Sequence, residues 1–258
     1  MPVINFLTNS LHYCVKGNGS KHLILFHGFG QDHQVYDTWY EQLSDKFKII
    51  AIDLPYHGLS SRSNQALSKE EWYELFKLLL QTEKIESFSL CGYSLGGRFA
   101  LTTAYHFHRQ INQLYLIAPD GIHKNRWYRL ATGPGRVLFK FLMKNPDRFF
   151  KLLDWLDRHH LVQPSISKFA RQELFPKENR IKVYQSWVYL KPLGHKKSDL
   201  IERFNREEIS IHLLVGDKDY IVKPSNLIPT FNKMKKIEIK TLPVKHHQLI
   251  DGSFGWIN

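Results

Sequence analysis

Serine, histidine and aspartate, the three residue types that together carry out acyl transfer, occur in this sequence beside glycine-rich turns. The clearest candidate is Ser94, in Leu90-Cys91-Gly92-Tyr93-Ser94-Leu95-Gly96-Gly97, with glycine two residues away on either side. The stretch predicts a buried strand that turns sharply into a helix near Leu95, and such a turn strains the serine backbone and exposes its hydroxyl. The flanking glycines avoid collisions across the turn. A glycine-rich turn with an incidental serine is the alternative.

A serine hydroxyl is a poor nucleophile unless a base removes its proton, and a carboxylate must then orient that base. The candidate acids lie in Gly216-Asp217-Lys218-Asp219, and the candidate bases, His246 and His247, follow the next apolar strand. The adjacent histidines are a poor zinc site, because neighbouring side chains rarely converge on one ion and no cysteine or carboxylate cluster accompanies them. We therefore expect no metal.

Apolar strands and helices that could position these groups alternate along the chain. A capping box, Ser68 with Glu71, opens one helix, and Gly17-Asn18-Gly19-Ser20 is expected to join two strands as a hairpin. This alternation predicts an α/β fold with a mostly parallel sheet and helices on both faces. The expected strands include 12–16, 22–26, 47–52, 113–118, 209–216 and 237–242.

The alternating pattern stops between residues 121 and 206. No convincing strand occurs there, and aromatic-rich helical stretches are separated by proline or glycine at 133–135, 145–146, 163–164, 175–176 and 191–192. We predict a core domain formed by 1–120 and 207–258, interrupted by a helical cap at 121–206.

The positive charge of the chain is concentrated in this predicted cap. The net charge is +12, and residues 121–206 contain 19 Lys and Arg against 7 Asp and Glu, whereas the remainder holds 17 of each sign. The excess is interpreted as a solvated basic face, as steering of an anionic substrate, or as peripheral contact with an anionic membrane. Nucleic-acid binding is not expected, because no recognised binding module is present.

Targeting and redox signals are sparse. The N-terminus lacks a basic region followed by an apolar stretch, and no segment approaches 18 uninterrupted apolar residues. The two cysteines, Cys14 and Cys91, lie in predicted strands and are no disulfide framework. We expect a soluble cytoplasmic protein with two free, buried cysteines.

Taken in order, five motifs resemble those of the α/β-hydrolase fold, in its capped, esterase-like branch. They are His27-Gly28-Phe29-Gly30, Asp53-Leu54-Pro55-Tyr56-His57-Gly58-Leu59-Ser60, Gly92-Tyr93-Ser94-Leu95-Gly96-Gly97, Gly216-Asp217-Lys218-Asp219 and His247. The resemblance implies that Ser94 is the nucleophile, at a nucleophile elbow. It also implies an oxyanion hole formed by the backbone N–H groups of Phe29 and Leu95.

The same resemblance suggests an acid and a base. Asp219 aligns with the acid of the family, with Asp217 and Asp120 as less favoured substitutes. His247 is favoured as the base, although His246 stands where the family usually carries glycine, and His246 would then be a loop residue or a substrate contact. Asp53 and His57, from the second motif, are expected to be structural.

These residues predict a serine hydrolase that cleaves a carboxylic ester or thioester of a small or acyl substrate, anionic ones included, through an acyl-enzyme. No cofactor is implied. Arg98 provides an alternative, because SHCHC synthase, a lyase relative of this fold, also has an arginine after the elbow glycines and uses arginines to hold substrate carboxylates. The other interpretation of Arg98 is an ion-paired or surface residue, and a non-catalytic binding protein on the same fold is the third hypothesis.

Overall fold

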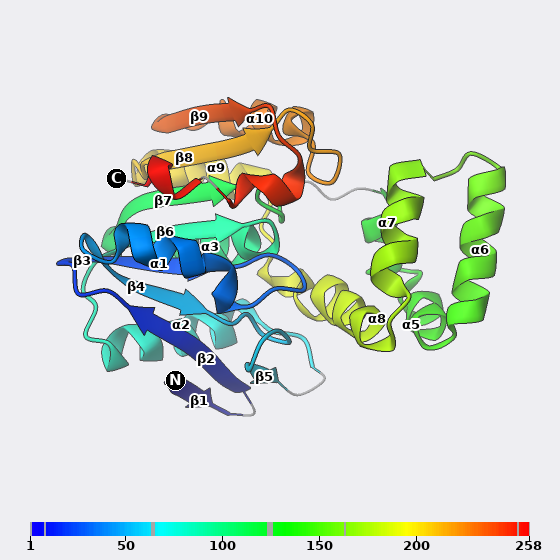
Figure 1. Ribbon diagram of the computed structural model, residues 1–258, viewed down its shortest axis with the longest axis horizontal. Coiled ribbons are helices and arrows are strands. Elements are labelled where there is room, and N and C mark those ends of the chain that lie inside the picture. The colour runs from blue at the N-terminus through cyan, green and yellow to red at the C-terminus, as the bar shows by residue number, and fades with distance from the viewer. Residues whose placement is uncertain are drawn as a thin grey trace. The chain divides into compact units, whose positions relative to one another are not determined.

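The sheet organises the first part of the structure. The computed structural model describes residues 2–7, 9–62, 65–122, 126–162, 164–251 and 253–257. Within them the strands are β1 Val3–Phe6, β2 Asn9–Lys16, β3 Lys21–Phe26, β4 Phe47–Ile52, β5 Ser61–Arg62, β6 Phe88–Tyr93, β7 Ile111–Ile117, β8 Ile211–Gly216 and β9 Ile237–Leu242. They form one sheet in the order β1-β2-β4-β3-β6-β7-β8-β9, with β5 paired to β2 (Figure 1). The neighbouring pairs from β4 to β9 are parallel, which confirms the predicted mostly parallel α/β sheet.

The predicted hairpin between β2 and β3 is wrong. Strand β4 lies between them, antiparallel to β2 and parallel to β3. The connection at 17–20 instead packs against the segment that leads into β4, where Asn18 N–H donates to the carbonyl of Ser44 at 3.1 Å. Gly17 has a φ of +80°, and a Cβ there would lie 2.3 Å from the carbonyl oxygen of Phe47. The glycine is therefore needed for close packing, not for a two-residue hairpin turn.

Helices cover both faces of the sheet. On one face α1 (Asp37–Leu43) packs with the C-terminal segment, and Trp39 Nε1 donates to the carbonyl of Ile250 at 3.2 Å. On the other face lie α2 (Lys69–Thr82) and α3 (Leu95–His106), where Trp72 contacts the rings of Phe26 and Phe99. The capping box predicted for α2 is present: Ser68 Oγ accepts from Glu71 N–H at 3.0 Å. Cys14 and Cys91 are buried and free, as predicted.

The chain divides into two compact units, one holding the sheet and one made of helices. The first comprises 1–63, 67–123 and 193–258, and the second comprises 64–66 and 124–192. Helix α9 (Lys197–Arg206), which the sequence assigned to the insertion, belongs to the first unit, where it contacts α3 and α10 (Pro224–Phe231). Its apolar residues Leu200 and Phe204 are buried there.

The second unit contains helices separated at the predicted breaks. They are α4 Arg126–Ala131, α5 Arg136–Lys144, α6 Pro146–Arg158, α7 Pro164–Leu174 and α8 Lys177–Tyr184, and α8 continues into a π-helical turn at Gln185–Tyr189. Proline opens α6 and α7, where its missing N–H has no helical partner to lose. Across the described residues of both units, no helix has the length and apolarity to cross a membrane.

Candidate active site

Ser94 lies at the turn from β6 into α3, in a backbone conformation rare for a residue with a side chain. Its φ is 50° and its ψ is −114°. Three hydrogen bonds hold this conformation: Ser94 N–H donates to the carbonyl of Ile117 at 2.9 Å, and Ser94 O accepts from Gly97 N–H at 2.9 Å and Asp120 N–H at 2.7 Å. Strain of this kind persists only where the surroundings fix it, and it is concentrated at functional sites.

The glycines around Ser94 are required by close approach of other groups. A Cβ on Gly96 would lie 2.0 Å from the carbonyl oxygen of Phe26, and one on Gly92 would lie 2.6 Å from the carbonyl oxygen of Gly96. A Cβ on Gly97 would meet the ring of Pro119 at 2.4 Å. Each approach is far shorter than a van der Waals contact, so the turn forms only with glycine at these positions.

His246, and not the predicted His247, lies beside the serine. The Nε2 atom of His246 is 2.9 Å from Ser94 Oγ, and its Nδ1 is 2.6 Å from Asp219 Oδ2. His246 is buried, whereas the side chain of His247 is exposed. The 3₁₀ helix at His246–Leu249 explains the difference, because neighbouring residues in such a helix point about 120° apart. The expectation that His247 contacts Ser94 is therefore wrong.

Asp219 is the carboxylate that reaches the imidazole. It follows β8 and is 3% exposed, and its Oδ1 accepts from the backbone N–H groups of Ile221 and Val222, both at 2.8 Å. Its other oxygen is left for His246 Nδ1. Asp217 is exposed in the turn, and Asp120 pairs elsewhere. Of the three candidate acids, Asp219 alone is brought to the histidine.

Tyr93 contacts the same histidine, a contact that the sequence pattern does not predict. Its hydroxyl donates to the carbonyl oxygen of His246 at 3.1 Å, and its ring centroid lies 5.3 Å from that of the imidazole. Burial raises the pKa of Tyr93 above its ordinary value, so the hydroxyl remains a neutral donor. The feature of the sequence that could have indicated this role is the position of Tyr93 immediately before Ser94.

The two predicted oxyanion donors lie in the loop after β3 and at the start of α3. Within the described ranges, neither the N–H of Phe29 nor that of Leu95 donates to a protein acceptor. The loop of Phe29 is fixed by His27, which accepts from Leu54 N–H at 3.0 Å through Nε2 and donates to the carbonyl of Gly28 at 2.7 Å through Nδ1. Burial, aided by nearby His57, lowers the pKa of His27 to about 3 and keeps the ring neutral.

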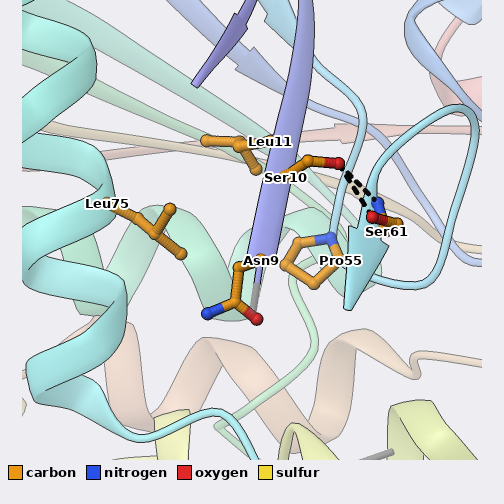
Figure 2. A pocket seen from close by; sticks show the side chains of 6 residues that line it. All are labelled: Asn9, Ser10, Leu11, Pro55, Ser61 and Leu75. Atoms are coloured by element: carbon orange, nitrogen blue, oxygen red, sulfur yellow. Dashed lines mark hydrogen bonds between the residues drawn. The ribbon is translucent and has the colours of Figure 1, made fainter. Parts of the chain in front are cut away.

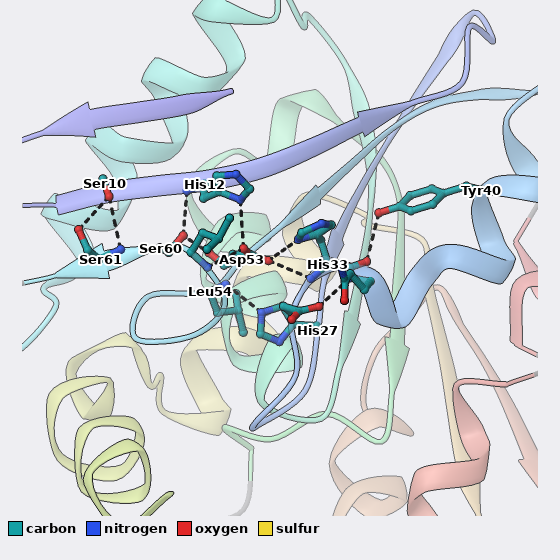
Figure 3. Close-up of polar contacts among 12 residues, drawn as sticks. Ser10, His12, His27, His33, Tyr40, Asp53, Leu54, Ser60 and Ser61 are labelled. Carbon is teal, nitrogen blue, oxygen red and sulfur yellow. Dashed lines mark hydrogen bonds and ion pairs between the residues drawn. The ribbon is translucent and has the colours of Figure 1, made fainter. Parts of the chain in front are cut away.

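Asp53 is the centre of a second buried polar cluster, with His12 and His33 (Figure 3). One carboxylate oxygen accepts from the backbone N–H and Nδ1 of His33, at 2.9 and 2.8 Å. The other accepts from Leu59 N–H at 2.9 Å and His12 Nδ1 at 3.1 Å. Burial favours protonation of Asp53, but these donors outweigh it and lower its pKa.

The atoms of this cluster are close enough together to bind a metal ion, since one ligand atom from each residue lies within 4.8 Å of the others. Each oxygen of Asp53 nevertheless accepts two N–H groups already. Gly58, with a φ of +53°, completes the enclosure, because a Cβ there would lie 2.3 Å from the carboxylate. This is the arrangement of a structural hydrogen-bond centre that fixes the loop after β4.

Arg98, the residue on which the lyase alternative depends, is buried in α3. Its guanidinium pairs with the carboxylate of Asp120, which also accepts from Gly121 N–H at 2.6 Å. Gly121 has a φ of +99° and packs against the aliphatic part of Arg98. Because the backbone N–H of Asp120 bonds to Ser94 O, the pair links α3 to the loop that supports the serine.

The pocket in Figure 2 is lined by Asn9, Ser10, Leu11, Pro55, Ser61 and Leu75. It has no volume accessible to a water molecule, and its serine hydroxyls bond to each other at 2.8 Å. It is therefore a packing gap and not a ligand site.

Sequence relatives cover part of the chain. An uncharacterized protein of Mycobacterium tuberculosis is 31% identical over 122 residues, 46% of this chain and 36% of the relative. A pimeloyl-[acyl-carrier protein] methyl ester esterase of Nitrosomonas europaea is 34% identical over 120 residues, 46% of this chain and 45% of that enzyme. The chain thus spans less than half the length of these curated relatives.

Solved structures resemble the chain over almost its full length. The enol-lactonase from Burkholderia xenovorans has a TM-score of 0.70 at 16% identity, covering 99% of this chain and 96% of that one. A thermophilic esterase from Thermogutta terrifontis has a TM-score of 0.71 at 17% identity, covering 96% and 92%. At such identities the likeness concerns the fold. A model of the alpha/beta hydrolase fold family matches residues 21–252, and the chain therefore belongs to that family.

Proposed function

We propose that the chain is a serine hydrolase of small carboxylic esters or thioesters. The observation that carries the proposal is the chain of hydrogen bonds from Ser94 Oγ through the His246 imidazole to the Asp219 carboxylate, at 2.9 and 2.6 Å. The strained, glycine-bounded turn that presents Ser94 supports it. Relatives named as esterases support the choice of an ester substrate.

In the proposed mechanism Ser94 Oγ attacks the acyl carbon while His246 Nε2 takes its proton. Asp219 keeps the proton of the imidazole on Nδ1 and stabilises the imidazolium that forms. The N–H groups of Phe29 and Leu95 stabilise the oxyanion. His246 then protonates the leaving alcohol or thiol, and water hydrolyses the acyl-enzyme with the same residue as base.

His246, and not the His247 that the sequence favours, is the base in this mechanism because it hydrogen-bonds to both Ser94 and Asp219. The buried position of Arg98 and its pairing with the Asp120 carboxylate support a structural role for that arginine. We therefore favour the hydrolase over the lyase, which requires an arginine that holds a substrate carboxylate. No residue of the proposed triad is missing, which also favours an enzyme over a binding protein.

A fluorophosphonate probe, which modifies activated serines, tests the proposal. We expect the wild-type protein to be labelled and the Ser94→Ala and His246→Ala variants to resist labelling. The His247→Ala variant is the matched control and should be labelled like the wild type. An unlabelled wild type, or labelling that survives Ser94→Ala, would refute the nucleophile assignment. A screen of esters and thioesters of increasing acyl length then defines the substrate.

A further inference from the structure

Two consecutive helices of the second unit expose large apolar side chains. In α5, Val137 is 82% exposed, and Leu138 and Phe141 are also exposed. In α6, Leu152 and Trp155 are exposed. We call these five side chains the α5–α6 face. Val137 and Phe141 are four positions apart on α5, and Leu152 and Trp155 are three apart on α6, so each helix presents these side chains along one side. Contiguous exposed apolar side chains mark an interaction surface.

A row of basic residues borders the apolar side chains of α5. Arg136, Lys140 and Lys144 follow one another at a spacing of four, so they lie along one side of the helix, and all three are exposed. Val137 and Phe141 form the adjacent row. The exposed surface of α5 therefore combines an apolar strip with a positively charged strip.

Arg148 joins the two helices at this surface. The guanidinium carbon of Arg148, from α6, lies 5.2 Å from the centroid of the Phe141 ring, a cation–π contact that places a cation against the apolar strip. Carboxylates are present on α6, but Asp154 is paired with Arg171 at 2.8 Å. Asp147 lies in the first turn, where the helix dipole favours a negative charge.

The positive charge of the second unit indicates which kind of partner fits the α5–α6 face. Residues 124–192 contain 15 Lys and Arg and 5 Asp and Glu. A nucleic acid would satisfy this charge but leave the apolar strip uncovered, and a second copy of the chain would bring like charges together. An anionic bilayer satisfies both strips, since its acyl boundary accepts apolar side chains and its headgroups accept lysine and arginine.

We propose that the α5–α6 face docks on an anionic lipid surface. Val137, Phe141 and Trp155 enter the boundary between headgroups and acyl chains, while the basic row of α5 binds lipid phosphates. The proposal does not depend on the proposed ester hydrolysis, because its test measures vesicle binding and not enzymatic activity.

Cosedimentation with vesicles tests the proposal. The full chain is mixed with vesicles of phosphatidylcholine alone or of phosphatidylcholine and phosphatidylglycerol in equal amounts. We expect binding to the anionic vesicles, weakened by added salt, and little binding to the neutral ones. A Val137→Glu/Phe141→Glu double variant should bind about tenfold or more weakly, because charges replace inserted apolar groups.

Two further variants separate the contributions. Leu7→Glu changes an equally exposed apolar side chain of the first unit and should bind like the wild type. Lys140→Glu/Lys144→Glu should lose binding to anionic vesicles while keeping the apolar strip. Circular dichroism checks that each variant folds. The proposal is overturned if the wild-type protein does not bind anionic vesicles, or if the Val137→Glu/Phe141→Glu variant binds them as tightly as the wild type. A wild-type dimer that Phe141→Glu dissociates, without vesicle binding, assigns the face to self-association and also overturns it.

Discussion

The hydroxyl of Tyr93 donates a hydrogen bond to the backbone carbonyl of His246 at 3.1 Å, across 153 positions of sequence. Tyr93 ends β6, one residue before Ser94, and His246 begins the turn after β9. The strand that presents the serine is thus tied directly to the backbone of the proposed base. This tie limits how far the imidazole can move from Ser94 Oγ.

Tyr93→Phe should therefore lower kcat more than it changes KM. The substitution keeps the ring and removes one hydrogen bond, whose typical net contribution of about 1 kcal/mol corresponds to about a fivefold effect. Steady-state kinetics on an ester found in the substrate screen measure it. Tyr40→Phe is the matched control, because its hydroxyl bonds to His33 O, outside the triad. Unchanged kcat in Tyr93→Phe would contradict the positioning role.

Asp219→Asn should lower kcat by about 10⁴-fold, because the amide no longer holds the imidazole in the required tautomer. Asp217→Asn should stay near wild-type activity, since Asp217 is exposed and Asp219 reaches the imidazole in its place. The two variants differ by two positions in the same turn and are compared in one kinetic assay. Equal losses of kcat in the two variants would show that activity depends on the conformation of the turn and not on the Asp219 carboxylate.

Arg98→Met should lower the melting temperature clearly and leave KM within about twofold of wild type. The substitution keeps much of the buried aliphatic stem but removes the hydrogen bond that ties the Asp120 carboxylate, which is 34% exposed, to α3. Thermal unfolding and steady-state kinetics measure the two effects. A large rise in KM with unchanged stability would instead indicate a substrate-binding arginine.

The glycine-bounded serine was predictable because local sterics dictate it: the backbone can form this turn only where Gly92, Gly96 and Gly97 lack side chains. The parallel sheet followed from the alternation of apolar strands and helices. Three candidate acids, Asp120, Asp217 and Asp219, follow strands at the carboxyl edge of the sheet, and only the resemblance to the family favoured Asp219 among them.

The choice between His246 and His247 could not be made from local pattern. It depends on where the 3₁₀ turn begins after Lys245, a difference of one residue that rotates each side chain by about a third of a turn. The hairpin prediction failed because strand pairing depends on distant segments of the chain. Strand β4, more than 20 residues after β3, pairs with both β2 and β3 and so separates them.

Asp53→Asn should reduce the free energy of unfolding by about 3 kcal/mol. The amide NH2 would replace one carboxylate oxygen, and the buried N–H groups that this oxygen accepts would lose their acceptor. Chemical denaturation followed by fluorescence measures the change. Asp45→Asn, at an exposed position, should have little effect. Equal stability of the two variants would contradict a structural role for the cluster.

His27 should make the protein less stable as the pH falls below neutrality. Burial lowers its pKa from the ordinary 6.5 to about 3, so between these values the unfolded chain binds a proton that the folded chain does not. Protons therefore favour unfolding, and this residue alone reduces the free energy of unfolding by up to about 1.4 kcal/mol for each pH unit below 6.5. The contribution is fully present above pH 6.5 and is lost as the pH falls toward 3.

His27→Gln tests this pH dependence, because the glutamine oxygen can still accept from Leu54 N–H while the side chain no longer titrates. We expect the variant to be less stable than the wild type at pH 7, but to lose less stability between pH 7 and pH 5. His247→Gln makes the same substitution at an exposed position and serves as the matched control. Denaturation curves at a series of pH values compare the three proteins. Parallel losses in wild type and His27→Gln would show that other groups control acid stability.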